Sequence, residues 1–193
     1  MQLENLKTNF LGRNVIYYPK IDSTQSEILR RIEKHQIENG TIIVADLQTE
    51  GKGTHGRKWY TTKENNIAFS FFLSADCNID SLLGLTIKIA QTMIVVFQNL
   101  YGITLQIKEP NDLVYRGKKI GGILTQTKVV GQKVKEIVIG IGVNTNQEEF
   151  EEEIKQIASS VKKEFNICVD NKKVISQFCN LFEKIFGEMI ENE

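Results

Sequence analysis

The stretch LVYRGKKIGGILTQTKVVGQKVKEIVIGIGVN, residues 113–144, carries the clearest information about the fold. The dipeptides Arg116-Gly117 and Gly131-Gln132 divide it into runs that are rich in β-branched and apolar residues. Such runs, separated by short glycine-containing turns, are typical of antiparallel strands joined by hairpins. We therefore expect consecutive antiparallel strands over residues 113–115, 119–129 and 134–143.

Further strands and helices flank these hairpins. Apolar alternation or β-branched content predicts strands over residues 15–18, 41–48, 66–74 and 104–108. Apolar side chains at helical spacing predict helices over residues 24–34, 82–100 and 148–190. Strands clustered in mid-chain with helices around them indicate an α+β fold: a mixed, mostly antiparallel sheet with helices packed on one face. The other face would then be free for a ligand.

Two helices carry more specific expectations. Thr24 and Glu27 have the spacing of a capping box, which predicts the start of the first helix. In the C-terminal region we expect Glu149–Ala158 to be a charged, exposed helix. Residues 171–190 should form a helix with an apolar face at Val174, Phe178, Phe182 and Phe186.

Length and charge restrict the class of protein. A chain of 193 residues has room for one domain, possibly with a small appendage. Its 24 Lys and Arg residues balance 24 Asp and Glu residues. Because the net charge is zero, no overall field draws the chain to nucleic acid or to a membrane, and we expect neither as a partner.

Cysteine usage and hydropathy restrict it further. The three widely spaced cysteines and the two histidines fit neither a disulfide framework nor a zinc spacing, so we expect no protein-ligated metal. The N-terminus is polar, and Lys88, Gln91 and Thr92 break the longest apolar stretch. We therefore expect neither a signal peptide nor a membrane span, and a cytoplasmic location.

The loop Gly51–Trp59, GKGTHGRKW, is the strongest local signal for a binding site. It places three glycines and three cationic side chains within eight residues. Glycines let backbone N–H groups approach an anion, and cations neutralise its charge, so the loop suits a phosphate or an adenylate. A solvated flexible loop is the alternative.

Two later segments also suit ligand binding. Lys108, in KEPNDL, ends a predicted strand and can place a positive charge at a pocket edge, although an ordinary turn with a surface lysine would look the same. Gly140 and Gly142 fall on one face of their strand, opposite Ile139 and Ile141. They would leave a floor without side chains for a planar ligand, or else mark a bulge or tight sheet packing.

Neutral polar residues complete the candidate set. Ser23, Thr24, Gln25 and Gln48 supply hydrogen-bond donors and acceptors. Taken alone, they would be explained by helix capping and by polarity at a strand end.

Taken together and in this order, these segments resemble the catalytic domain of biotin protein ligases. The family's signatures GRGRRGRxW, KWPNDL, KxxGIL and GIGxN correspond here to residues 51–59, 108–113, 119–124 and 140–144. The resemblance covers about residues 15–145 and implies the class II synthetase-like fold of biotin and lipoate ligases. It implies a single catalytic domain over 1–193, with C-terminal helices over about 148–190. We expect neither an N-terminal helix-turn-helix domain nor a C-terminal SH3-like domain in the chain.

The resemblance implies a reaction in two steps. Biotin and MgATP form biotinyl-5′-AMP and pyrophosphate, and biotin then passes to one lysine of a biotin carboxyl carrier protein. The implied catalytic residues are Lys108 and Arg57. The implied biotin-binding residues are Ser23, Thr24, Gln25, Gln48, Gly51, Lys52, Gly53, Thr54, Lys108 and Gly122. The implied nucleotide-binding residues are Lys52, Arg57, Trp59, Asn111, Asp112, Lys119 and Asn144. Pairing into a homodimer is a further expectation.

The sequence departs from the family pattern at four positions. Lys52 and Thr54 stand where arginine is usual, Glu109 replaces a tryptophan, and Gln126 replaces a common acid. A lipoate or octanoate ligase or transferase of the same fold and a non-catalytic biotin sensor remain alternatives. A DNA-binding regulator is the weakest, because the sequence has no basic recognition helix.

Overall fold

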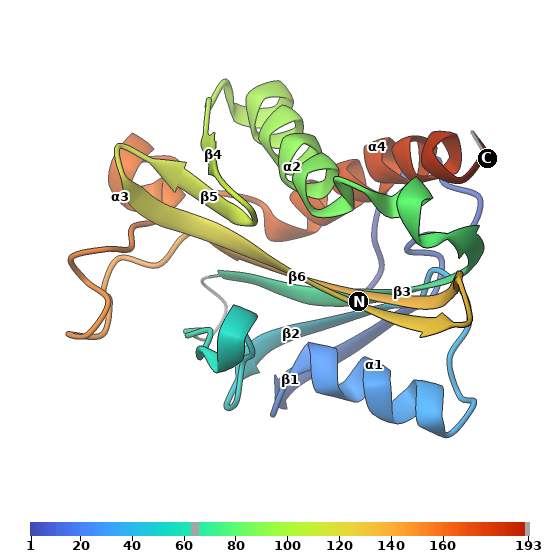
Figure 1. Cartoon of the computed structure of the whole chain (residues 1–193). Helices are drawn as coiled ribbons and strands as arrows, with labels where there is room; N and C mark the ends of the chain where they lie inside the picture. The colour runs from blue at the N-terminus through green and yellow to red at the C-terminus, as the bar shows by residue number, and fades with distance from the viewer. Residues whose placement is uncertain (63–65, 192–193) are drawn as a thin grey trace.

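The structure, a computed structural model, describes residues 1–62 and 66–191 (Figure 1). Its centre is a seven-stranded sheet with the strand order β1-β2-β3-β7-β6-β5-β4. The strands are β1 (Val15–Ile21), β2 (Ile42–Gln48), β3 (Asn66–Asn78), β4 (Gln106–Lys108), β5 (Asp112–Tyr115), β6 (Lys118–Val130) and β7 (Lys133–Asn144). The α-helices are α1 (Thr24–Glu33), α2 (Leu85–Tyr101), α3 (Val161–Phe165) and α4 (Asn171–Glu191), and short 3₁₀ turns lie at η1 (Thr54–Gly56) and η2 (Ile79–Leu82).

The sheet is mixed, as predicted. β1 and β2 run parallel, whereas the other neighbouring strands pair antiparallel. The two predicted hairpins are present, because β5 pairs with β6 and β6 pairs with β7. The prediction of an α+β fold with a mostly antiparallel sheet is confirmed.

The main core lies between one face of the sheet and helices α2 and α4 (Figure 1). Alternate residues of β7, including Ile139 and Ile141, point into this core. From α4, Phe178 and Phe182 are fully buried, and their rings contact the ring of Phe71 on β3. The predicted apolar face of the C-terminal helix is confirmed, since burial of these rings is what holds α4 on the sheet.

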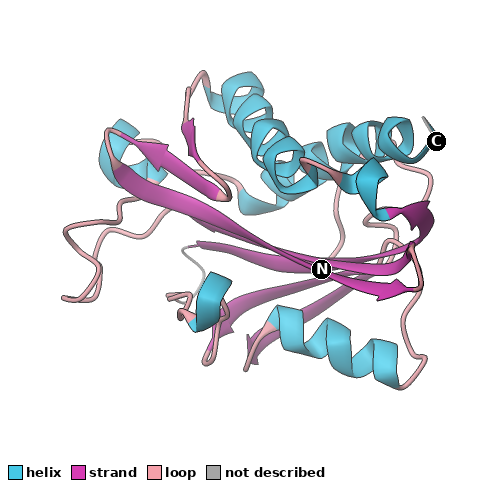
Figure 2. Ribbon diagram, viewed as in Figure 1, coloured by secondary structure: helices cyan, strands magenta, loops and turns pink. Residues whose placement is uncertain are grey.

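Helices cover both faces of the sheet, contrary to the expectation that all of them pack on one face (Figure 2). α1 packs on the opposite face, where Ile28 lies in a smaller cluster with Ile43, Phe72 and Val138. α1 connects the parallel strands β1 and β2, and such a crossover places its helix on a face of the sheet. The ligand face is therefore the part of this face that α1 leaves uncovered.

The start of α1 differs by one residue from the capping-box prediction. Ser23 is the N-cap, and its side chain accepts a hydrogen bond from the backbone N–H of Ser26. Thr24 is the first helical residue, and its hydroxyl is bonded to other side chains. Glu27 pairs with Arg30 and Arg31 and does not cap the helix, so the predicted box is wrong.

The segment 149–158 is not the predicted charged helix. It forms turns, and Ala158 makes a parallel bridge with Lys119 at the start of β6. The Lys119 N–H donates to the carbonyl of Ile157, and the Ser159 N–H donates to the carbonyl of Lys119. The segment keeps single turns, such as the bond from the Lys155 N–H to the Glu151 carbonyl, and its end is held by these backbone bonds to the sheet.

The stretch Ile79–Tyr101 is long and apolar enough to cross a membrane, by length and composition alone. By length and composition, the expectation that Lys88, Gln91 and Thr92 make this stretch too short for a membrane span was therefore wrong. In the fold, Ile89, Met93 and Phe97 of α2 are fully buried in the main core. A core helix of a globular protein passes the same test, so this stretch is explained by packing.

Candidate functional site

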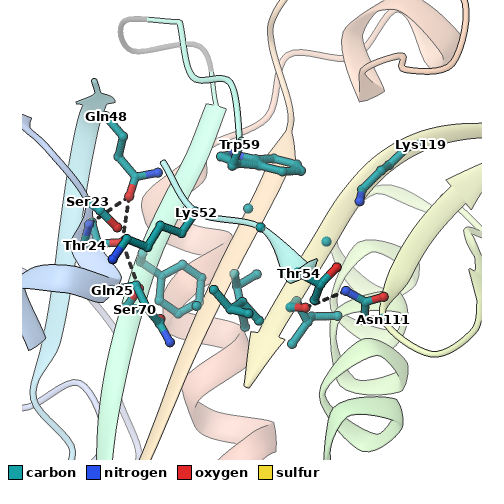
Figure 3. Close-up of a pocket in the computed structure, with 18 residues that line it drawn as sticks. Ser23, Thr24, Gln25, Gln48, Lys52, Thr54, Trp59, Ser70, Asn111 and Lys119 are labelled. Atoms are coloured by element: carbon teal, nitrogen blue, oxygen red, sulfur yellow. Dashed lines mark hydrogen bonds between the residues drawn. The ribbon is translucent and has the colours of Figure 1, made fainter. Parts of the chain in front are cut away.

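The candidate site lies on the α1 face of the sheet, where the loop after β2 folds over β6 and β7 (Figure 3). The polar, glycine-punctuated stretch 49–65 predicts a long loop, of which residues 63–65 lie outside the described part of the chain. Two adjoining cavities meet here and share four lining residues: Gly53, Thr54, Trp59 and Lys119. The first cavity adjoins the start of α1, and the second extends toward β4, β5 and the turns after β7.

A connected set of neutral polar side chains forms one wall of the first cavity. Gln48 at the end of β2 accepts hydrogen bonds from the Thr24 N–H at 2.8 Å and from the Thr24 hydroxyl at 3.0 Å. The Thr24 hydroxyl lies 2.8 Å from that of Ser70 on β3. Since the Thr24 proton is used on Gln48, Ser70 donates to Thr24. The wall therefore holds its polar groups in fixed orientations although all three residues are buried.

Gln25 extends this wall across β7. Its side-chain N–H group donates to the side-chain oxygen of Gln126 at 2.9 Å and to the carbonyl of Val138 at 3.3 Å. Its own oxygen is buried and has no hydrogen-bond partner. A buried acceptor without a partner is unusual in a folded protein and marks a place for a ligand donor.

Trp59 covers the glycine floor predicted on β7. A Cβ atom on Gly142 would lie 2.3 Å from the indole, and one on Gly122 of β6 would lie 3.6 Å from it. Gly122 and Gly142 are direct partners in the sheet register. Figure 3 shows the indole lying across this floor between Gln48 and Lys119. The floor is flat, as predicted, and the protein's own planar ring occupies it.

The glycine-rich loop forms a small hairpin of its own. Lys52 bridges Lys58, and the Gly53 N–H donates to the carbonyl of Arg57 at 2.7 Å. The Arg57 guanidinium in turn donates to the carbonyl and to the hydroxyl of Thr54, both at 3.3 Å. Arg57 is exposed, so its charge remains available to an anion that enters the second cavity.

Most of the charged side chains that line the second cavity are cations. Arg57, Lys58, Lys108 and Lys119 line it together with one carboxylate, that of Asp112. The Lys119 ammonium pairs with this carboxylate at 2.6 Å and lies 5.8 Å from the Trp59 ring centroid. Four cations against one anion favour a ligand with several negative charges.

Two asparagines hold the backbone around the cavities. The Asn111 amide donates to the carbonyl of Ile123 at 2.9 Å, which ties the β4–β5 turn to β6. The Asn144 amide donates to the carbonyl of Ser159 at 3.1 Å, which fixes the turns after β7 beside the second cavity.

The structure brings most of the predicted site residues together, but it divides them between the two cavities differently from the prediction. The predicted biotin-binding residues that line the first cavity are Ser23, Thr24, Gln25, Gln48, Lys52, Gly53, Thr54 and Gly122. Gly51 and Lys108 do not line it: Lys108 lies in the second cavity, and Gly51 lies in an open groove beside the loop. The predicted nucleotide-binding residues that line the second cavity are Arg57, Trp59, Asp112, Lys119 and Asn144. Lys52 and Asn111 line the first cavity instead.

Sequence reasoning missed three contributions. Ser70 is the first: it is a polar residue within an apolar strand, and this pattern is the signal that could have identified it. In the structure its side chain is fully buried. Gln126 was noted only as a departure, although its oxygen orients Gln25. The segment around Ile154 and Ile157, predicted as a charged, exposed helix, is largely exposed as predicted, but it forms turns that also line the second cavity.

An ion-pair network fixes the start of α1 beside the polar wall. The Arg30 guanidinium contacts both carboxylate oxygens of Asp22, at 2.6 and 2.8 Å, and also pairs with Glu27. The hydrogen bonds from Arg30 lower the pKa of Asp22 from 3.8 to about 2. Asp22 directly precedes the N-cap Ser23, so the pair holds the wall residues in place.

The variant Asp22→Asn should lose the ion pair and about 1 kcal/mol of unfolding free energy at pH 7, a value reduced for partial exposure. Because the folded pKa of Asp22 is depressed, this stabilisation is present above pH 4 and disappears as the pH falls toward 2. Urea unfolding at pH 7 and near pH 2.5 measures both values. The control is Asp76→Asn, whose pair with Lys135 is exposed. A difference from wild type that persists unchanged at low pH would contradict the explanation.

Comparisons with known proteins agree with this arrangement. The chain is 34% identical over 185 residues to the bifunctional ligase/repressor BirA of Bacillus subtilis, covering 95% of this chain and 57% of that protein. It is 32% identical over 143 residues to BirA of Escherichia coli, covering 74% of this chain and 44% of that protein. The chain thus spans about half the length of these curated relatives.

A solved structure has a similar fold. The biotin protein ligase from Aquifex aeolicus in complex with biotin and ATP superposes with a TM-score of 0.72 at 30% sequence identity, covering 93% of this chain and 71% of that chain. Residues 17–144, which contain the polar wall, the loop, Lys108 and the glycine floor, match the description Biotin/lipoate A/B protein ligase family. The chain belongs to this family.

Proposed function

We propose that the chain is an ATP-dependent ligase that activates biotin as biotinyl-5′-AMP and transfers the biotinyl group to a lysine of a biotin carrier domain. The two relatives named above are bifunctional ligase/repressors, and the solved neighbour is a biotin protein ligase in complex with biotin and ATP. The family description covers lipoate ligases as well, so the choice between biotin and lipoate as the substrate rests on the first cavity.

The single observation that carries the choice is the buried, neutral polar wall. Thr24, Gln48 and Ser70 form a hydrogen-bonded chain, and the Gln25 oxygen beside it has no partner. The ureido ring of biotin is neutral and carries both N–H donors and a carbonyl acceptor, so it can satisfy such a wall. The dithiolane ring of lipoate has no donor for the Gln25 oxygen.

The first cavity must widen when a ligand enters. Its interior volume is about 40 Å³, which is space for a few water molecules and too little for a bicyclic headgroup. The second cavity, of about 330 Å³, is larger. Trp59 and part of the loop 51–59 line the first cavity, so we expect their movement to make room for the ligand.

The cationic second cavity suits the first chemical step. The biotin carboxylate attacks the α-phosphorus of ATP, an oxygen–phosphorus bond forms, and pyrophosphate leaves with its electron pair. Negative charge grows on the phosphate oxygens in the transition state, where fixed positive groups are most effective. Lys108 and Arg57 lie on this cavity and supply that charge.

In the second step the amine of the acceptor lysine attacks the carbonyl carbon of biotinyl-5′-AMP. An amide bond forms, AMP leaves, and the amine loses a proton. This step requires no covalent intermediate on the enzyme.

Mg²⁺ would accompany ATP. Within residues 1–62 and 66–191 there is no group of three or more His, Cys, Asp or Glu side chains that could hold a metal. Mg²⁺ commonly keeps several waters and binds substrate phosphates with one or two carboxylates, and Asp112 is the carboxylate on the second cavity.

Mass spectrometry of a carrier domain tests the proposal. The domain is incubated with the chain, MgATP and either biotin or lipoate. We expect a mass gain of one biotinyl group that requires ATP, and no gain with lipoate. A lipoyl-sized gain, or none with either acid, would overturn the proposed function.

A further inference from the structure

The orientation of the Gln25 amide is fixed by the strands beneath it. Its side chain is 3% exposed, and its nitrogen lies 3.3 Å from the carbonyl oxygen of Val138. A backbone carbonyl only accepts hydrogen bonds, so the nitrogen of the amide must be on this side. The Gln25 oxygen therefore points the other way.

Gln126 is the second group that fixes this orientation. Its side-chain oxygen accepts from the Gln25 nitrogen at 2.9 Å. Gln126 on β6 is the direct sheet partner of Val138 on β7, so the two acceptors lie side by side below α1. Together they use both N–H donors of the amide.

The free oxygen of Gln25 lies over Gly140. A Cβ atom on Gly140 would be 2.7 Å from this oxygen, so any larger residue would displace the amide. The oxygen is buried and without a partner, and both residues line the first cavity. The cavity thus presents an acceptor whose donor must come from a ligand.

We propose that Gln126 is a positioning residue, which holds the Gln25 amide so that its oxygen accepts an N–H of the ureido ring of biotin. The proposal rests on the proposed function. It adds Gln126 as the residue through which the Gln25 oxygen is set to accept a hydrogen bond from the ligand. Without the Gln126 acceptor, one Gln25 N–H loses its partner, and only the longer 3.3 Å bond to the Val138 carbonyl still orients the amide, which is then held less firmly. The cavity then offers a mixture of donor and acceptor to the ligand.

Position 126 allows a matched series of variants. Gln126→Met and Gln126→Lys both remove the acceptor at similar length, and the exposed position lets a lysine reach solvent. Gln126→Glu keeps an acceptor. Gln132→Met makes the same change as Gln126→Met at an exposed turn away from α1 and serves as the control.

Calorimetry of biotin binding without ATP gives the readout, with thermal unfolding to verify each fold. Loss of one hydrogen bond and its orienting effect should weaken biotin binding about tenfold in the Met and Lys variants. Gln126→Glu should stay within about threefold of wild type. Wild-type affinity in the Met and Lys variants, or an equal loss in Gln126→Glu, would overturn the proposal.

A double-mutant cycle separates positioning from general packing. If Gln126 acts through Gln25, the change Gln126→Met should have almost no further effect in a Gln25→Met background. An equal loss with and without Gln25 would show that Gln126 acts by another route and would overturn its positioning role. A wild-type chain that binds lipoate and not biotin would overturn the proposed function as well, so the two failures give different results.

Discussion

Replacing Lys108 with alanine should lower the turnover rate of biotin-dependent pyrophosphate release at least a hundredfold. Lys108 ends β4 and lines the cationic second cavity, which adjoins the first cavity, where biotin would bind. A fixed positive group that acts on growing transition-state charge contributes about 3–4 kcal/mol, which corresponds to a factor of a hundred or more.

The kinetic constants distinguish this role from simple binding. Because the charge acts mainly on the transition state, kcat should fall much more than the KM values for ATP and biotin rise. The control is Lys88→Ala, which removes an exposed lysine from α2 on the other face of the sheet. A Lys108→Ala enzyme within about threefold of wild type would contradict the assignment of Lys108.

The second large effect is expected for Gly142→Ala. The new methyl group would lie 2.3 Å from the Trp59 ring, a distance that no pair of carbon atoms tolerates, so the indole must leave its floor. Forcing an extra methyl group into a packed site costs about 1–3 kcal/mol. We expect ligation activity to fall at least tenfold, because the ring that lines both cavities is displaced.

Tryptophan fluorescence measures this displacement directly. Trp59 is the single tryptophan of the sequence, so its emission reports on the site alone. Emission should shift to longer wavelength in Gly142→Ala as the indole becomes more exposed. The control is Gly187→Ala on α4, where a Cβ has no neighbour within 4 Å, and its emission should match that of wild type. An unchanged emission in Gly142→Ala would show that Trp59 does not rest on Gly142.

Local patterns determined much of the architecture before any tertiary contact was known. The hairpins of β5, β6 and β7 follow from apolar runs interrupted by Arg116-Gly117 and Gly131-Gln132, because turn chemistry and strand alternation are local properties. The apolar face of α4 follows from helical spacing alone, and Phe178 and Phe182 are buried as expected.

The errors come from segments whose partners are distant in sequence. Residues 149–158 are charged enough for an exposed helix, yet their backbone bonds to Lys119 on β6. The amphipathic pattern of α1 predicts a buried face but not the side of the sheet against which it is buried. Only the pairing of β1 with β2, and the crossover that it requires, settles that side.

The same division applies to the site. Ser23, Gln48, Lys108 and the loop 51–59 could be identified as candidates from residue type and order along the chain. The contribution of Ser70 to the polar wall, and the contact of Gln126 with Gln25, 101 positions away, became visible in the folded protein. The physical reason is that hydrogen bonds between side chains depend on strand register and helix placement, which are set by the packing of the whole sheet.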